Sequence, residues 1–162
     1  LSTVLGEAVF TRQQQADLGL PAYTGDHAER RRESGFALYE ALGIAREDKE
    51  ARALQGLKNF SFFGAPHVAI LTTDRDLGQY GVLDCGTYLG TLMLLLQDAG
   101  LGVIAQGAIA MYSDVVRDFL DLPEQRQVVC AVSFGHEDTT DPVNAFRTAR
   151  ADVGDSLHHV TD

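Results

Sequence analysis

A long segment near the middle of the chain, residues 81–99, constrains the fold more than any other part of the sequence. Its apolar side chains recur at the i, i+3, i+4 and i+7 positions of an α-helix, and they cover much of the helix circumference. The residues that form this pattern are Cys85, Tyr88, Leu89, Leu92, Met93 and Leu96. Because such a helix needs cover over much of its surface, we expect it to be the central element of the fold.

Three apolar segments predict a sheet beside this helix. Residues 66–74 form a continuous apolar run rich in β-branched side chains, which is typical of a buried strand. Residues 101–105 and 127–135 predict two further strands. Three short strands make a poor sheet alone. We therefore expect a partner chain or a further segment to complete the sheet.

Helical patterns fill most of the remaining sequence. They are expected at residues 1–18 with an end near Gly19, at about 28–42, at about 46–57 and at 113–120. Helices precede the first strand and alternate with the strands after it. This order predicts an α+β fold with a central antiparallel or mixed sheet flanked by helices.

Composition excludes several classes of function. The 162 residues suit one domain, and a net charge of −10 argues against binding to nucleic acid. The basic run Arg30–Arg32 lies between Glu29 and Glu33, which is typical of a solvated helix face. No apolar run is long enough to span a bilayer. Cys85 and Cys130 are isolated and predict buried free thiols, so a cytoplasmic location is expected.

Motifs for hydrolases, nucleotide-binding loops and metal sites are missing from the sequence. The five histidines have no partners at metal-ligand spacing, so no metal site is predicted; they are His27, His67, His136, His158 and His159. Two other features stand out. Ala105-Gln106-Gly107 follows a predicted strand, where a glycine allows either a simple turn or a close approach to a flat ligand. Arg147 and Arg150 either clamp a phosphate or are two solvated side chains.

The order of several motifs resembles the FMN-dependent nitroreductase family, in particular its nitrobenzoate-reductase-like branch. The matching segments are NFSFFGAP, DCGTYLGTLMLLLQDAGLG, VIAQGA, SDVVRDFLDLP, VVCAVSFGHED and DPVNAFRTARADV, with the helical stretch RRRESGFALYEALGIAREDKEAR upstream. The resemblance covers most of the chain. It implies a single nitroreductase-like domain over residues 1–162, with a helical insertion at 25–58 and a C-terminal tail at 141–162.

The resemblance also implies a cofactor and a reaction. FMN is expected to be reduced by NAD(P)H and then to reduce a nitroaromatic, a quinone or a related acceptor, in a ping-pong hydride transfer. Ala105, Gln106 and Gly107 correspond to the family's loop at the reactive edge of the flavin. Arg150, with Arg147 nearby, corresponds to its phosphate-binding basic residues.

Partners and acceptor contacts follow from the same resemblance. The family forms intertwined homodimers, and residues 154–160 are the candidate segment for crossing to a partner. Acceptor contacts are expected at Phe36, Tyr39 or Phe60, for which packing in the core is the alternative.

The chain also departs from the family pattern. Thr148 stands where relatives carry a lysine, which removes one charge from the phosphate clamp. The N-terminal Arg-x-Ser-x-Arg-type segment and the Trp-containing stretch after it have no counterpart, and the opening LSTVLGEAV resembles the helix that follows them. We therefore expect an N-terminally truncated enzyme. The alternative is a non-catalytic nitroreductase-like module that dimerises or binds a ligand.

Overall fold

The structure is a computed structural model that describes residues 1–160, and these form two compact units. The first unit comprises residues 1–21 and 50–137, and the second comprises residues 22–49 together with the chain from Asp138 onward. Thr161 and Asp162, the end of the predicted tail, lie outside the described residues. The predicted single domain with an insertion at 25–58 and a tail at 141–162 stays a prediction.

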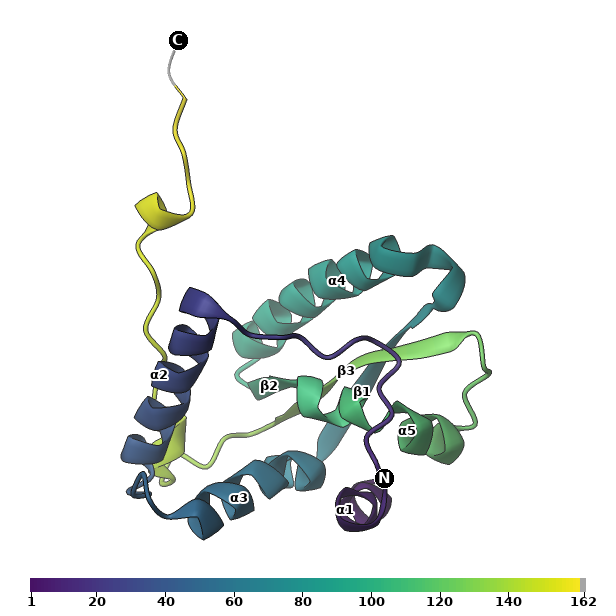
Figure 1. Cartoon of the computed structure of the whole chain (residues 1–162), viewed down its shortest axis with the longest axis horizontal. Coiled ribbons are helices and arrows are strands. Elements are labelled where there is room, and N and C mark those ends of the chain that lie inside the picture. Colours follow the sequence, from purple (N-terminus) through teal and green to yellow (C-terminus); the bar gives the residue numbers. More distant parts are fainter. Residues whose placement is uncertain (161–162) are drawn as a thin grey trace. The chain divides into compact units, whose positions relative to one another are not determined.

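A three-stranded antiparallel sheet lies at the centre of the first unit (Figure 1). Its strands are β1 (His67–Asp74), β2 (Gly102–Gln106) and β3 (Arg126–Gly135), in the order β1-β3-β2. The middle strand β3 is buried over most of its length, which agrees with its continuous apolar sequence. The predicted α+β class is confirmed, and each predicted strand lies within one or two residues of its observed position.

A β-bulge interrupts the pairing of β1 with β3. Leu71 pairs with Cys130 and Thr72 pairs with Val128, so Val129 is the extra residue. Val129 and Cys130 therefore both pack on the side of the sheet that faces the long helix, while Val128 packs on the other side. The bulge keeps apolar side chains on both faces of the strand.

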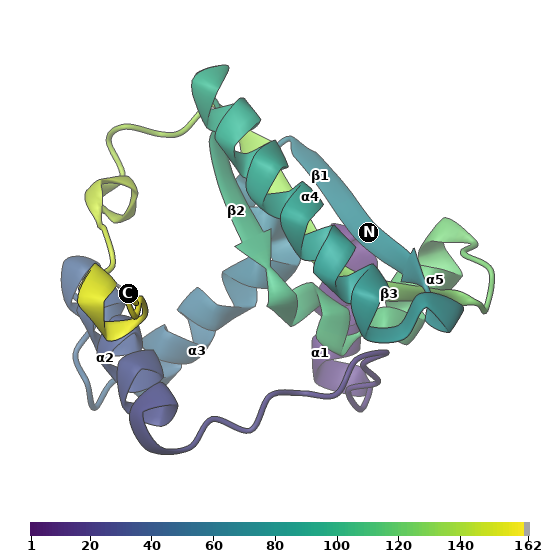
Figure 2. The ribbon, with the colours of Figure 1, turned by 90° about the horizontal axis from the view of Figure 1, so that it is seen from above.

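The long helix α4 (Gly78–Asp98) covers one face of this sheet (Figure 2). Cys85, Leu89 and Leu92 pack against a buried cluster centred on Leu71, Cys130 and Val132. The rest of the helix is less covered than its sequence predicts, because Gly81 is its one buried residue. Much of the apolar circumference that the sequence predicts for this helix is therefore exposed in this chain taken alone.

The other face of the sheet carries the larger core. It is covered by α1 (Ser2–Thr11), η1 (Lys58–Gly64), η3 (Gly107–Met111) and α5 (Ser113–Leu120), and η2 (Arg75–Leu77) links β1 to α4. Leu5, Ile109, Val116 and Val128 are fully buried there. The first helix ends at Thr11 rather than near Gly19, because Arg12 is extended and the following residues form a loop. That loop runs beside Tyr112, to which Gln15 forms an isolated parallel bridge.

The second unit consists of an exposed helix and a largely irregular C-terminal segment. Its elements are α2 (Gly25–Ala41), η4 (Pro142–Ala145) and η5 (Val153–Asp155), while α3 (Lys49–Leu57) begins at the boundary with the first unit. No residue of α2 is buried, although η4 packs against this helix. Within residues 1–160 no helix has both the length and the apolar character needed to cross a membrane.

Candidate functional site

The loop Ala105-Gln106-Gly107 lies where β2 ends and η3 begins. Ala105 and Gly107 are exposed, whereas the Gln106 side chain is 2% exposed and turns into the first unit. A Cβ built on Gly107 would meet no heavy atom within 4 Å. The backbone of this loop is therefore open on the outside and anchored on the inside, which is the environment that a flat ligand in contact with main-chain groups needs.

Gln106 is held by hydrogen bonds to two other elements. Its Nε2 donates to the backbone oxygen of Asn59 in η1 at 2.9 Å, with Asn59 Oδ1 at 3.4 Å. Its Oε1 accepts a hydrogen bond from Ser133 in β3, a residue that is 1% exposed. The side chain of Gln106 is thus committed to the interior, and the loop has only its backbone to offer to a ligand.

The η1 segment beside this network has an unusual backbone. Phe62 and Phe63 have φ values of 55° and 53°, and Gly64 continues the left-handed conformation at 76°. Left-handed backbone is costly for a residue with a Cβ, and it persists where the surroundings hold it in place. Phe62 is 6% exposed, so burial of its ring supplies part of that restraint.

Phe60, one of the three expected acceptor contacts, lies in the larger core of the first unit. It is 7% exposed, and its ring meets Tyr112 edge to face with centroids 5.5 Å apart. Phe60 was expected either to contact the acceptor or to pack in the core, and its position here is that of a core residue.

Phe36 and Tyr39, the other two expected contacts, lie together on α2 in the second unit. Their rings meet edge to face with centroids 6.4 Å apart, and both side chains are half-buried. The guanidinium of Arg46 lies 4.4 Å from the centre of the Phe36 ring, a cation–π contact. Arg46, Phe36 and residues on the same side of α2 line a cavity of about 320 Å³.

Arg147 and Arg150 are both exposed in the C-terminal segment of the second unit. Arg147 donates to the backbone oxygens of Asn144 and Phe146, at 2.7 and 2.8 Å. Arg150 donates to the backbone and hydroxyl oxygens of Thr148 and to the backbone oxygen of Ala149. Within the described residues neither guanidinium forms an ion pair with a carboxylate. Their positive charge therefore remains free to meet an anion.

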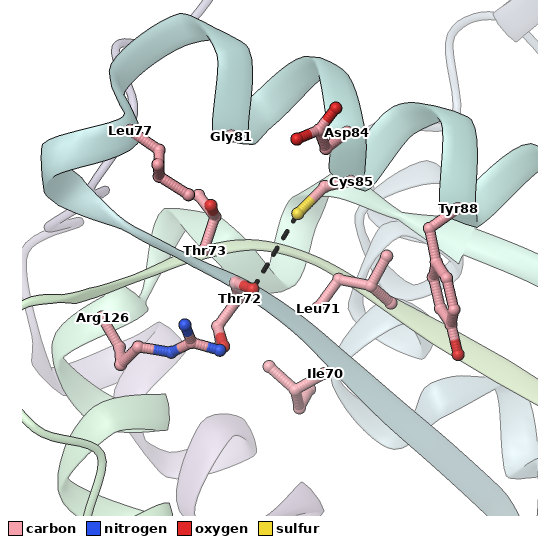
Figure 3. A pocket seen from close by; sticks show the side chains of 10 residues that line it. All are labelled: Ile70, Leu71, Thr72, Thr73, Leu77, Gly81, Asp84, Cys85, Tyr88 and Arg126. Carbon is pink, nitrogen blue, oxygen red and sulfur yellow. Dashed lines mark hydrogen bonds between the residues drawn. The ribbon is translucent and has the colours of Figure 1, made fainter.

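A cavity of about 400 Å³ lies between β1 and the first half of α4 (Figure 3). Cys85 points into it and donates a long hydrogen bond to the backbone oxygen of Thr72 at 3.9 Å. Burial raises the pKa of the Cys85 thiol, and the charge of Asp84 raises it further. The thiol therefore stays protonated and is a poor nucleophile. The sequence did not predict this cavity, because it depends on how α4 packs on β1.

The Asp17 carboxylate, in the loop after α1, was also not singled out in the sequence. Its Oδ1 accepts hydrogen bonds from Arg75 and Arg117, each at 2.5 Å, and its Oδ2 accepts from the Val128 N–H at 2.8 Å. Burial alone would raise the pKa of this carboxyl, but the hydrogen bonds from these three groups outweigh it and lower the pKa. Asp17 is a structural anion in this arrangement.

The part of the chain that the structure describes contains no candidate metal centre. Among residues 1–160 no group of three or more His, Cys, Asp and Glu side chains lies close enough to hold a metal ion.

The chain is similar in sequence to known proteins. The model of the Nitroreductase family matches residues 10–136. A 4-nitrobenzoate reductase of Pseudomonas putida is 36% identical over 124 residues, which are 76% of this chain and 55% of that protein. Nitroreductase NfnB of Mycolicibacterium smegmatis is 35% identical over 134 residues, 83% of this chain and 57% of that protein. The chain spans about half the length of these curated relatives.

Solved structures give the same result. The crystal structure of the FMN-dependent nitroreductase NfnB from Mycobacterium smegmatis in complex with NADPH matches with a TM-score of 0.92 and 31% identity, over 99% of this chain and 72% of that one. The crystal structure of the FMN and NADPH-dependent nitroreductase NfnB from Sphigopyxis sp. strain HMH matches with a TM-score of 0.91 and 31% identity, over 99% of this chain and 76% of that one.

Proposed function

This chain belongs to the nitroreductase family, and we propose that it is part of an FMN-dependent oxidoreductase. In this proposal NAD(P)H reduces the enzyme, which then reduces nitroaromatics, quinones or related acceptors in a ping-pong hydride transfer. The observation that carries the proposal is the match, at a TM-score of 0.92 and over 99% of the chain, to an FMN-dependent nitroreductase solved with NADPH. The 4-nitrobenzoate reductases among the relatives support an aromatic acceptor.

The residues present fit an FMN in two places. The open backbone at Ala105 and Gly107 suits a flat ring system, since Gly107 leaves free space where another residue would have a side chain. Arg147 and Arg150 suit a phosphate, because their charges are not neutralised by carboxylates within the described residues. When bound, FMN would supply the hydride chemistry between NAD(P)H and the acceptor.

The chain's own residues bind and orient in this proposal. Backbone dipoles of Ala105-Gln106-Gly107 would face the reactive edge of the ring and stabilise charge there without reorganising. We assign no general acid or base to the protein. Phe36 and Tyr39, which are half-buried, are the proposed aromatic contacts for the acceptor.

A homodimer belongs to the same proposal. Tyr80, Leu83, Tyr88, Leu94 and Leu95 of α4 are between 61% and 79% exposed, although all are large apolar or aromatic residues. Contiguous apolar surface of this kind usually marks an interface. We propose that a second copy covers it and that residues 154–160, where Leu157 is 63% exposed, cross to that copy. We also propose a cytoplasmic location. Cys85 and Cys130 are both free thiols, and thiols stay reduced in the cytosol.

The test of the proposed function is retention of flavin. The purified chain is incubated with FMN, desalted and examined by visible absorption, before and after addition of NADPH or NADH under nitrogen. Flavin bands that remain and then bleach support the redox proposal. A colourless protein that still dimerises contradicts it for this chain and supports the alternative, a non-catalytic module of the same fold.

A further inference from the structure

A chain of hydrogen bonds that is buried at its Ser133 end runs inward from the loop Ala105-Gln106-Gly107. It starts at Ser133 in β3, passes through the carboxamide of Gln106 at the end of β2, and reaches Asn59 in η1. Asn59 Nδ2 in turn donates to the backbone oxygen of Gly56 in α3 at 3.0 Å. Contacts between residues distant in sequence therefore link three elements of the first unit, β2, β3 and η1, and a local bond from Asn59 adds the end of α3.

The orientation of the Gln106 amide follows from its partners. The backbone oxygen of Asn59 can only accept, so the amide must present its NH₂ group there. The remaining oxygen then faces Ser133, whose hydroxyl donates to it. The backbone oxygen of Asn59 thus fixes the orientation of the amide, because the Ser133 hydroxyl could donate or accept and so adapts to the end of the amide that remains.

Placing a glutamine side chain in the core costs more free energy than placing an apolar side chain there. Moving an amide out of water costs free energy unless its hydrogen bonds are replaced, and an apolar side chain of similar size would avoid that cost. Because a fully satisfied buried network fixes geometry, Gln106 restricts where the end of β2 lies relative to β3 and η1. Its neighbours Ala105 and Gly107 are the exposed backbone of the candidate site.

We infer that Gln106 is a positioning residue: anchored by Ser133 and Asn59, it fixes the exposed backbone of Ala105–Gly107 and thereby sets the reduction potential of the bound flavin. The inference rests on the proposed function. Fixed backbone dipoles favour one redox state of the ring over the other only when they are held in place. Loosening the anchor therefore changes the ratio of the affinities for oxidised and reduced FMN.

The experiment measures the midpoint potential of the bound flavin in Gln106→Met and Ser133→Ala, together with the dissociation constants for oxidised FMN. Gln106→Met keeps the approximate volume and removes both hydrogen bonds, while Ser133→Ala removes one and is the gentler change. Gln127→Met is the matched control, because Gln127 is also buried in β3 but lies at the other end of the strand, opposite Thr73.

The expected result is a change of roughly tenfold in the ratio of affinities for the two redox states in Gln106→Met. For a two-electron couple this is a shift of about 30 mV in midpoint potential. A smaller shift of the same sign is expected in Ser133→Ala and none in Gln127→Met. A purely structural role would weaken both redox states equally and leave the potential unchanged.

The outcomes separate this inference from the proposed function. Bound flavin with an unchanged potential in both variants overturns the inference alone. A wild-type chain that binds no FMN overturns the inference together with the proposed function. If Gln106→Met fails to fold, Ser133→Ala decides the question by itself.

Discussion

At the scale of single residues, the carboxylate of Asp17 joins a loop to three other segments of the first unit. Its side chain is 8% exposed, and it meets Arg117, which is 18% exposed, and Arg75, which is 39% exposed. Replacing Asp17 by Asn would leave the partly buried Arg117 guanidinium without its counter-charge. We expect a loss of about 3 kcal/mol in the free energy of unfolding, measured by urea denaturation near neutral pH. Asp118→Asn, an exposed change of the same kind in α5, should have little effect.

The lowered pKa of Asp17 also predicts how this loss depends on pH. Because the folded-state pKa lies below the ordinary value of 3.8, the carboxylate stabilises the folded chain at pH values above that range. The stabilisation fades as the pH falls through the folded-state pKa. The difference in stability between the wild type and Asp17→Asn should therefore shrink as the pH is lowered below about 4. A difference that stays constant into strong acid would contradict the ion-pair explanation.

Arg147 and Arg150 lead to a prediction about the proposed cofactor. Each guanidinium lacks a carboxylate partner among the described residues, so each can form a charge-assisted bond to a phosphate. Such bonds contribute about 1.5–3 kcal/mol, so Arg150→Ala should weaken FMN binding by roughly tenfold to a hundredfold. The dissociation constant is measured by quenching of flavin fluorescence. Arg30→Ala, the loss of an exposed arginine on α2, is the control for net charge, and an equal effect there would refute a phosphate site at Arg150.

At the scale of elements, the contact between α4 and β1 depends on Gly81. A Cβ there would overlap Thr73 Oγ1 and would lie 2.9 Å from Leu77 Cβ, and Thr73 is itself 5% exposed. Gly81→Ala should therefore destabilise the chain by about 1–3 kcal/mol, although alanine is the better helix former. Thermal unfolding checks this. Gly6→Ala in α1, where a Cβ meets nothing within 4 Å, should be neutral or stabilising.

A double variant makes the cause of that loss explicit. If overlap with Thr73 is responsible, adding Thr73→Ala to Gly81→Ala should recover part of the stability that the two single changes lose in sum. Strictly additive effects would mean that the helix, rather than its contact with β1, is disturbed.

The elements that could be predicted from the sequence are those with local patterns. The strands at 67–74 and 126–135 follow from runs of β-branched residues, and the helix at 113–120 follows from Ser113 at its start and Pro123 after its end. The end of the first helix could not be predicted, because Arg12, Gln15 and Asp17 are held by partners far along the chain. Asp17 binds Arg117, a hundred residues away, and no local pattern reports such a contact.

The candidate site shows the same division. The glycine after β2 marked the loop 105–107, since a glycine at a strand end is visible in the sequence. The burial of the Gln106 side chain could not be predicted from the sequence, because it depends on Ser133, which lies 27 residues further along the chain in β3. The exposure of one side of α4 could not be predicted either. A pattern of apolar residues indicates that something packs on the helix, but it does not indicate whether the same chain or another chain does so.

At the scale of the whole molecule, the exposed side of α4 predicts the oligomeric state. Leu83 and Leu94 lie eleven residues apart, three helical turns, and so share one side of the helix, where they are 63% and 74% exposed. If a second copy covers this side, analytical ultracentrifugation of the wild-type protein should give twice the mass of one chain. Leu83→Glu combined with Leu94→Glu should shift it to the monomer, because carboxylates buried at such an interface would have no partners.

Gln97→Glu adds charge to the same helix without removing an apolar side chain, and it should leave the dimer intact. A wild-type chain that is monomeric at all concentrations tested, with no change in the leucine variant, would mean that something other than a second copy covers α4.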